Sequence, residues 1–105
     1  MAEIFLNETQ DRSIARARVG DTIVLSLTEN PTTGYRWKIS ATAPLAAVAD
    51  DFRAADAASG SGGRRIARFT TSVSGSARLE AELCRSWQPD TVLQRFAATI
   101  EIVAA

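Results

Sequence analysis

Cys84 is the only cysteine of this chain, and no histidine occurs among its 105 residues. Cysteine and serine nucleophiles normally need a histidine as their base, and histidine is also the commonest protein ligand of zinc. Arg85 follows Cys84, but one arginine activates a thiol only modestly. The sequence therefore argues against Cys-His and Ser-His-Asp catalysis, and we predict a structural role for Cys84 on the charged side of its strand. A single cysteine also rules out an internal disulfide.

The charges of the chain are balanced. Twelve lysines and arginines match twelve aspartates and glutamates, so no net field attracts nucleic acid or an anionic membrane. No apolar run approaches the roughly 20 residues that cross a bilayer, and residues 1–10 lack the pattern of a signal peptide. We expect a soluble protein without cofactor, metal, nucleic-acid partner or membrane partner. Its compartment stays open between the cytoplasm and, if a signal peptide was removed, the periplasm or the exterior.

A short segment between two expected strands combines three residue types that fix the course of a turn. Proline sets one backbone angle and removes a donor, glycine permits positive φ, and asparagine can cap a turn with its side chain. The segment should therefore be stiff and sharply bent, although a tight turn alone says nothing about binding. It consists of Asn30, Pro31, Thr32, Thr33, Gly34 and Tyr35.

A second segment is rich in glycine and is followed by Arg64 and Arg65. A glycine-rich loop lets its backbone approach a partner, but this one precedes a strand and lacks the lysine of a P-loop, which disfavours nucleotide binding. Taken alone it reads as a flexible connection, and the two arginines either flank it or meet acidic residues on a partner. The segment consists of Gly60, Ser61, Gly62 and Gly63.

The third segment, Arg85, Ser86 and Trp87, lies just beyond an expected strand. Arginine and tryptophan are among the residues most enriched in interface hot spots. A tryptophan at the start of a loop is also harder to bury than one within a strand. We therefore expect Trp87 to be available to a partner.

The elements that must hold these segments are strands, because apolar residues recur with a period of two. Trp37, for example, shares its parity with Tyr35 and Ile39, and we expect it in the core. Seven such stretches, separated by turn residues, predict one domain over residues 1–105, an all-β immunoglobulin-like sandwich of about seven or eight strands. The stretches are 4–6, 15–19, 22–27, 35–39, 67–73, 78–83 and 95–102.

Residues 41–58 do not fit this alternation. They are rich in alanine, and Pro44 stands where a short helix could begin. We favour an irregular connection with a short strand around Phe52, because a long helix would fit poorly among the neighbouring strands.

Together the three segments resemble the motifs of the chagasin family. Residues 30–35 look like its NPTTG(Y/F) signature, residues 60–63 like its GxGG loop, and residues 85–87 like its RPW motif. The motifs occur in the family's order, and the resemblance covers essentially the whole chain. Ser86 departs from it, because the family most often has proline there. The freer loop should weaken binding by up to about 1 kcal/mol without abolishing it.

The resemblance implies an immunoglobulin-like fold and reversible, competitive inhibition of papain-like cysteine peptidases, without chemistry of its own. A monomer is expected, because a wedge that fills a cleft needs no partner subunit. The three loops would gather at one end of the sandwich and fill the active-site cleft. Thr32, Thr33 and Gly34 would cover the catalytic cysteine and histidine of the enzyme. Residues 60–63 would lie along one side of the cleft through backbone contacts, and Arg85 and Trp87 would grip the other.

Other functions stay open at this point. The first is a non-inhibitory immunoglobulin-like interaction module, which Ser86 favours. The second is a carbohydrate-binding module built on Trp87, disfavoured because only 7% of the residues are aromatic. An enzyme is third, and it is disfavoured because neither paired carboxylates nor a metal-binding motif is visible.

Overall fold

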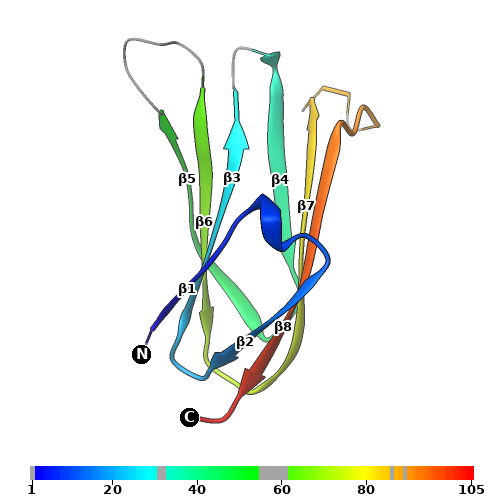
Figure 1. The fold of residues 1–105 in the computed structure, drawn as a ribbon. Coiled ribbons are helices and arrows are strands. Elements are labelled where there is room, and N and C mark those ends of the chain that lie inside the picture. Colours follow the sequence, from blue (N-terminus) through cyan, green and yellow to red (C-terminus); the bar gives the residue numbers. More distant parts are fainter. Residues whose placement is uncertain (1, 31–32, 55–61, 86, 89) are drawn as a thin grey trace.

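The computed structural model describes residues 2–30, 33–54, 62–85, 87–88 and 90–105. Across this part of the chain, eight strands and one short 3-10 helix form two four-stranded sheets (Figure 1). No helix in the described segments is long and apolar enough to cross a membrane. The elements are β1 (Glu3–Leu6), η1 (Glu8–Gln10), β2 (Ser13–Arg18), β3 (Thr22–Glu29), β4 (Tyr35–Ala41), β5 (Leu45–Ala54), β6 (Gly63–Thr71), β7 (Gly75–Arg85) and β8 (Gln94–Val103).

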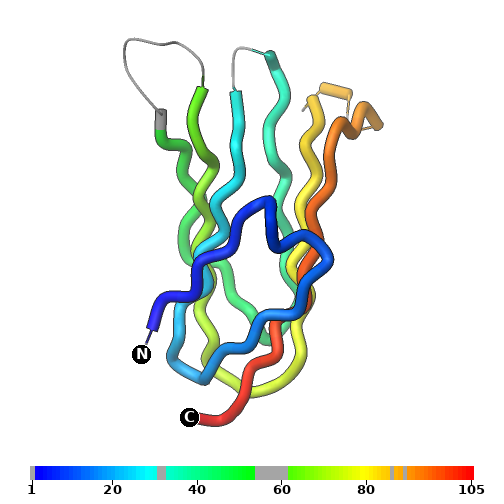
Figure 2. The backbone as a smooth tube through the Cα atoms, viewed as in Figure 1, coloured from blue at the N-terminus to red at the C-terminus, as the bar shows by residue number. Residues whose placement is uncertain are grey.

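The two sheets have the strand orders β1-β3-β6-β5 and β2-β8-β7-β4. β1 pairs with β3 and β2 with β8 in parallel, whereas all other neighbours are antiparallel. The chain from β1 through η1 to β2 therefore crosses from one sheet to the other, as the blue part of the tube shows (Figure 2). This arrangement confirms the predicted all-β, immunoglobulin-like sandwich.

An apolar core fills the space between the sheets. Alternate residues of β3, β7 and β8 point into it, because successive side chains of a strand face opposite sides. Trp37 of β4 is 5% exposed, and its Nε1 donates to the carbonyl of Thr28 in β3 at 2.8 Å, so it joins the two sheets. The predicted core position of Trp37 is confirmed. The fully buried apolar residues are Ile23, Leu25, Leu27, Leu79 and Ile100.

Two expectations about strand boundaries were wrong. Residues 45–54 form β5, a ten-residue edge strand, where we expected an irregular connection with a short strand around Phe52. Backbone pairing with β6 overrides the low strand propensity of alanine, and a register shift leaves Val48 at a bulge. The alternation over residues 67–73 also ends early, because β6 stops at Thr71 and Val73 is exposed.

Cys84 has the strand parity predicted for it but is only 6% exposed. It lies on β7, an interior strand with β4 on one side and β8 on the other, and Arg36 is its partner in register on β4. Long side chains on neighbouring strands can cover a small residue on the outer face of a sheet. The thiol of Cys84 is thus withdrawn from solvent and is not paired in a disulfide.

Candidate functional site

Three connections leave the sandwich at the same end, β3–β4, β5–β6 and β7–β8 (Figure 1). Strand register fixes where they start and finish. Glu29 pairs with Gly63 across β3 and β6, and Tyr35 pairs with Arg85 across β4 and β7. The strand ends that flank the three predicted segments therefore lie together, while both chain termini lie at the other end.

The predicted binding residues divide into two groups. Contacts can be traced for the first group, and they decide how the three connections are held relative to one another. The first group consists of Asn30, Thr33, Gly34, Tyr35, Gly62, Gly63, Arg85 and Trp87. The second group lies outside the described residues and consists of Pro31, Thr32, Gly60, Ser61 and Ser86.

The β3–β4 and β7–β8 connections meet where the indole of Trp87 lies over Gly34. A Cβ atom on Gly34 would stand 2.7 Å from Cη2 of Trp87, closer than two carbon atoms can approach. The φ of Gly34 is +80°, a conformation that other residues rarely adopt. A side chain at this position would therefore strain the backbone and displace the indole. Trp87 keeps 66% of its surface exposed.

The β3–β4 and β5–β6 connections meet at Gly62. Its φ is +97°, and a Cβ atom there would stand 2.8 Å from Cα of Asn30 and 2.8 Å from the carbonyl oxygen of Glu29. The backbone before β6 thus packs directly against the backbone that follows β3. A side chain at Gly62 would separate the two connections.

Thr33 stabilises the β3–β4 connection from within. Its amide and its hydroxyl both donate to the carbonyl of Asn30, at 3.2 and 2.8 Å. The same hydroxyl accepts from the amide of Tyr35 at 3.3 Å. Through Thr33, these bonds link the first residue of β4 to the residue after β3, so the connection is held as a closed turn.

Arg85 is held against the aromatic ring of Tyr35. Its guanidinium carbon lies 4.8 Å from the ring centroid, a cation–π contact between the end of β7 and the start of β4. The Nε atom of Arg85 is buried and has no hydrogen-bond partner among the described residues. Beyond it, the amide of Gln88 donates to the Arg85 carbonyl at 3.0 Å, so Trp87 stands in a tight turn.

A buried ion pair between Glu29 and Arg65 lies at the base of these connections, and we did not predict it. The distance from Nη2 of Arg65 to Oε2 of Glu29 is 2.7 Å, and the Glu29 side chain has no exposed surface. The bond to Glu29 raises the pKa of Arg65, which keeps the arginine charged. Glu29 continues the buried parity of Ile23, Leu25 and Leu27, and a charge at such a position signals a buried partner.

Arg64, the other arginine after the glycine-rich segment, binds Glu8 at 2.7 Å. Both arginines therefore have partners within the chain. The expectation that they only flank the loop or meet acidic residues on a partner omitted this structural role. The reason is that Glu8 and Glu29 are far from them in sequence, and the fold brings them close.

Leu93 is an exposed apolar residue at the same end that we also did not predict. It is 65% exposed and lies just before β8, where its amide donates to the carbonyl of Leu83 at 2.8 Å. It continues the outward parity of Arg95, and this is the signal that could have revealed it. With Trp87, it gives the β7–β8 connection two exposed apolar side chains.

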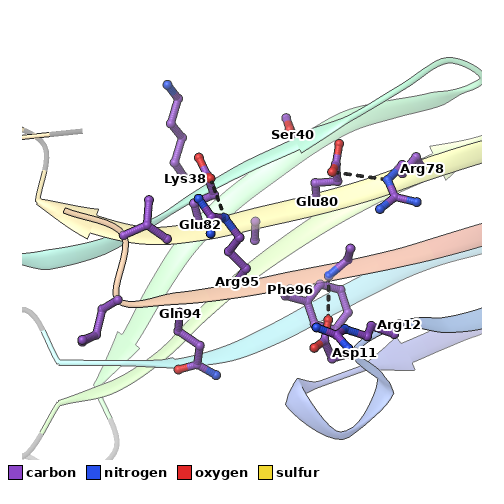
Figure 3. A pocket seen from close by; sticks show the side chains of 14 residues that line it. Asp11, Arg12, Lys38, Ser40, Arg78, Glu80, Glu82, Gln94, Arg95 and Phe96 are labelled. Atoms are coloured by element: carbon purple, nitrogen blue, oxygen red, sulfur yellow. Dashed lines mark hydrogen bonds and ion pairs between the residues drawn. The ribbon is translucent and has the colours of Figure 1, made fainter. Parts of the chain in front are cut away.

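A groove of about 840 Å³ lies along β4, β7 and β8, and Leu93 is one of the residues that line it (Figure 3). Its charges are mostly paired, with Arg78 3.3 Å from Glu80 and Arg95 3.1 Å from Glu82. This is the solvated, charged strand face that the alternation predicts. Among the described residues, no group of three or more acidic or cysteine side chains is arranged to hold a metal ion.

Several solved structures share the fold of this chain. EhICP2, a cysteine protease inhibitor from Entamoeba histolytica, superposes with a TM-score of 0.85 at 22% identity, covering 97% of this chain and 96% of its own. Amebosin has a TM-score of 0.77 at 25% identity, with 95% and 97% covered. PbICP-C, solved in complex with falcipain-2, has a TM-score of 0.62 at 13% identity, with both chains fully covered.

The family is identified by comparison of the sequence. No curated protein sequence gives a significant match to the chain. The model of the chagasin family peptidase inhibitors I42, however, matches residues 16–102, which span most of the sandwich and all three predicted motifs. The chain therefore belongs to the chagasin family, the inhibitors of papain-like cysteine peptidases.

Proposed function

We propose that this protein inhibits papain-like cysteine peptidases reversibly and competitively, by placing the three adjoining connections in the active-site cleft. Thr33 and Gly34 cover the catalytic cysteine and histidine of the enzyme, together with Pro31 and Thr32, which lie outside the described residues. The observation that carries the proposal is the contact of Trp87 with Gly34, since it joins two family motifs into one surface.

The sides of the cleft are contacted by the other two connections. Gly62 and Gly63, with Gly60 and Ser61, lie along one side through backbone contacts, and Arg85, Ser86 and Trp87 lie along the other. Trp87 presents a large exposed apolar surface to the enzyme. Because the scaffold already holds Gly62, Arg85 and Trp87 in place, docking costs less conformational entropy than binding a flexible peptide.

The same rigidity explains why the protein is not cleaved. A cysteine peptidase attacks an extended peptide whose carbonyl faces the thiolate in near-attack geometry. The hydrogen bonds of Thr33 and the positive φ of Gly34 hold this segment in a closed turn, which is not extended. The connection fills the cleft without presenting a bond that can be attacked.

The inhibitor needs no chemistry of its own. The chain has no histidine to activate a nucleophile, and the one thiol, Cys84, is buried. The rate loss in the enzyme comes from occupancy of the cleft alone. Inhibition should therefore be reversed by dilution, with no covalent adduct in a mass spectrum of either protein.

The test is a titration of papain, with a fluorogenic peptide as substrate, against the purified protein. The proposal is supported if inhibition is saturable and its apparent Ki increases with the substrate concentration. A flat titration by folded protein, repeated with a cathepsin L-type enzyme, contradicts it and favours the non-inhibitory interaction module.

A further inference from the structure

Glu29 makes a two-point contact with Arg65 in the interior of the sandwich. Oε2 of Glu29 lies 2.7 Å from Nη2 of Arg65, and Oε1 accepts from its Nε at 3.3 Å. The Arg65 side chain is 16% exposed and that of Glu29 is not exposed at all. The pair is thus shielded from the solvent and salt that weaken surface ion pairs.

The same carboxylate also reaches the opposite sheet. Oε1 of Glu29 accepts from the backbone amide of Trp37 in β4 at 2.7 Å. Glu29 is the last residue of β3, and Trp37 is the third residue of β4. One side chain therefore fixes the distance between the two strands that the β3–β4 connection joins.

Arg65 makes the corresponding contacts around the β5–β6 connection. It follows Gly63 closely on β6, its Nη1 lies 3.4 Å from Oδ1 of Asp50, and its guanidinium carbon lies 5.8 Å from the centroid of the Phe52 ring. Asp50 and Phe52 belong to β5. The arginine therefore contacts both strands that the second connection joins.

A buried ion pair is a poor device for stability alone. Removing two charges from water costs as much as their attraction returns, and apolar residues of similar size often stabilise a fold more. The pair contributes a defined orientation, because a guanidinium and a carboxylate bind each other in a fixed geometry. The pair lies at the base of the two connections that meet at Gly62, so its fixed geometry can set how these connections are oriented.

We infer that Glu29 and Arg65 are positioning residues, which hold the β3–β4 and β5–β6 connections in the mutual orientation that the peptidase binds. The inference rests on the proposed function. The ion pair does not contact the enzyme, and it acts through the backbone of Asn30 and Gly62. Its loss leaves the fold in place but makes the enzyme reorder the two connections when it binds.

Glu29→Gln is the main test, because glutamine keeps the acceptor for the Trp37 amide and removes the charge that faces Arg65. We expect the Ki for papain to rise about tenfold in conditions where every variant is fully folded. Arg65→Lys keeps the charge but loses the two-point contact of the guanidinium with Glu29, and it should raise Ki by a smaller factor. Amide hydrogen exchange at Thr33 and Tyr35 should become faster in both variants.

Two controls separate positioning from general stability. Glu3→Gln removes another 2.7 Å ion pair on β6, that with Arg68, and should leave Ki and loop exchange unchanged. Ile102→Val weakens the core within β8 and should lower the unfolding midpoint without changing Ki.

The outcomes are distinct. An unchanged Ki and unchanged exchange in Glu29→Gln overturn the inference while the proposed function stands, and so does an equal rise of Ki in Ile102→Val. If the wild-type protein does not inhibit, the proposed function fails, and the exchange rates alone decide whether the pair orders the two connections. If Glu29→Gln does not fold, Arg65→Lys decides in the same way.

Discussion

The indole of Trp87 lies so close to Gly34 that a Cβ atom on the glycine would stand 2.7 Å from Cη2 of the tryptophan. Two motifs that are separated by some fifty residues of sequence are thus in direct contact. The position of the tryptophan depends on the absence of a side chain at the glycine. This dependence gives the first prediction.

Gly34→Ala should weaken inhibition about tenfold or more, because the new methyl group displaces Trp87 and strains a backbone with φ of +80°. The measurement is a double-mutant cycle on Ki with Trp87→Ala. The two changes should be far from additive, because the glycine acts partly through the tryptophan. Simple additivity would contradict the coupling.

Trp87→Ala should raise Ki about 30-fold, the effect of losing roughly 2 kcal/mol at an interface anchor. Stability should hardly change, because Trp87 is mostly exposed in the free protein. Chemical unfolding and the papain assay measure the two effects separately. Val48→Ala is the matched control, since Val48 is also exposed but lies on the bulge of β5, and it should leave Ki unchanged.

Thr33→Val should raise Ki several-fold, because valine keeps the branched shape of threonine but loses the hydroxyl that bonds Asn30 and Tyr35. The loss of two exposed hydrogen bonds corresponds to about 1 kcal/mol. Thr33→Ser keeps the hydroxyl and should stay closer to the wild-type Ki. The opposite ranking of the two variants would show that the shape of Thr33 matters and its hydrogen bonds do not.

Acid should destabilise the protein partly through Glu8. Partial burial opposes ionisation of this residue, but hydrogen bonds from Thr28 and Arg64 outweigh it and lower its pKa from 4.5 to about 2. A lowered pKa stabilises the fold above pH 4.5, and this contribution is lost as the pH falls toward 2. Urea unfolding of wild type and Glu8→Gln across this range should show the difference in unfolding free energy shrinking as the pH falls. A constant difference would contradict the assignment.

Much of the fold follows from the sequence because alternation is a local property. The burial of Ile23, Leu25 and Leu27, and the core position of Trp37, can be inferred from strand parity alone. β5 was harder, because its alanine-rich sequence carries little alternation and its pairing with β6 decides its state. A partner strand cannot be read from the residues of the strand itself.

The site divides in the same way. The motif residues could be named because their types are unusual, and the range of the family match includes them. The pairing of Glu29 with Arg65 could not, since the two are 36 positions apart and only the register of β3 with β6 brings them together. The exposure of Leu93 follows from the outward parity of Arg95, but the predicted strand began at residue 95 and did not include it.

The contacts of Gly34 with Trp87, and of Gly62 with Asn30, also limit how this scaffold can be engineered. Immunoglobulin-like sandwiches display new loops well when each loop can be exchanged independently of the others. Here a new sequence in one connection meets a neighbour shaped for the old one. A library that redirects this protein to another enzyme should therefore vary the three connections together, or keep both glycines and vary only the other positions of the connections.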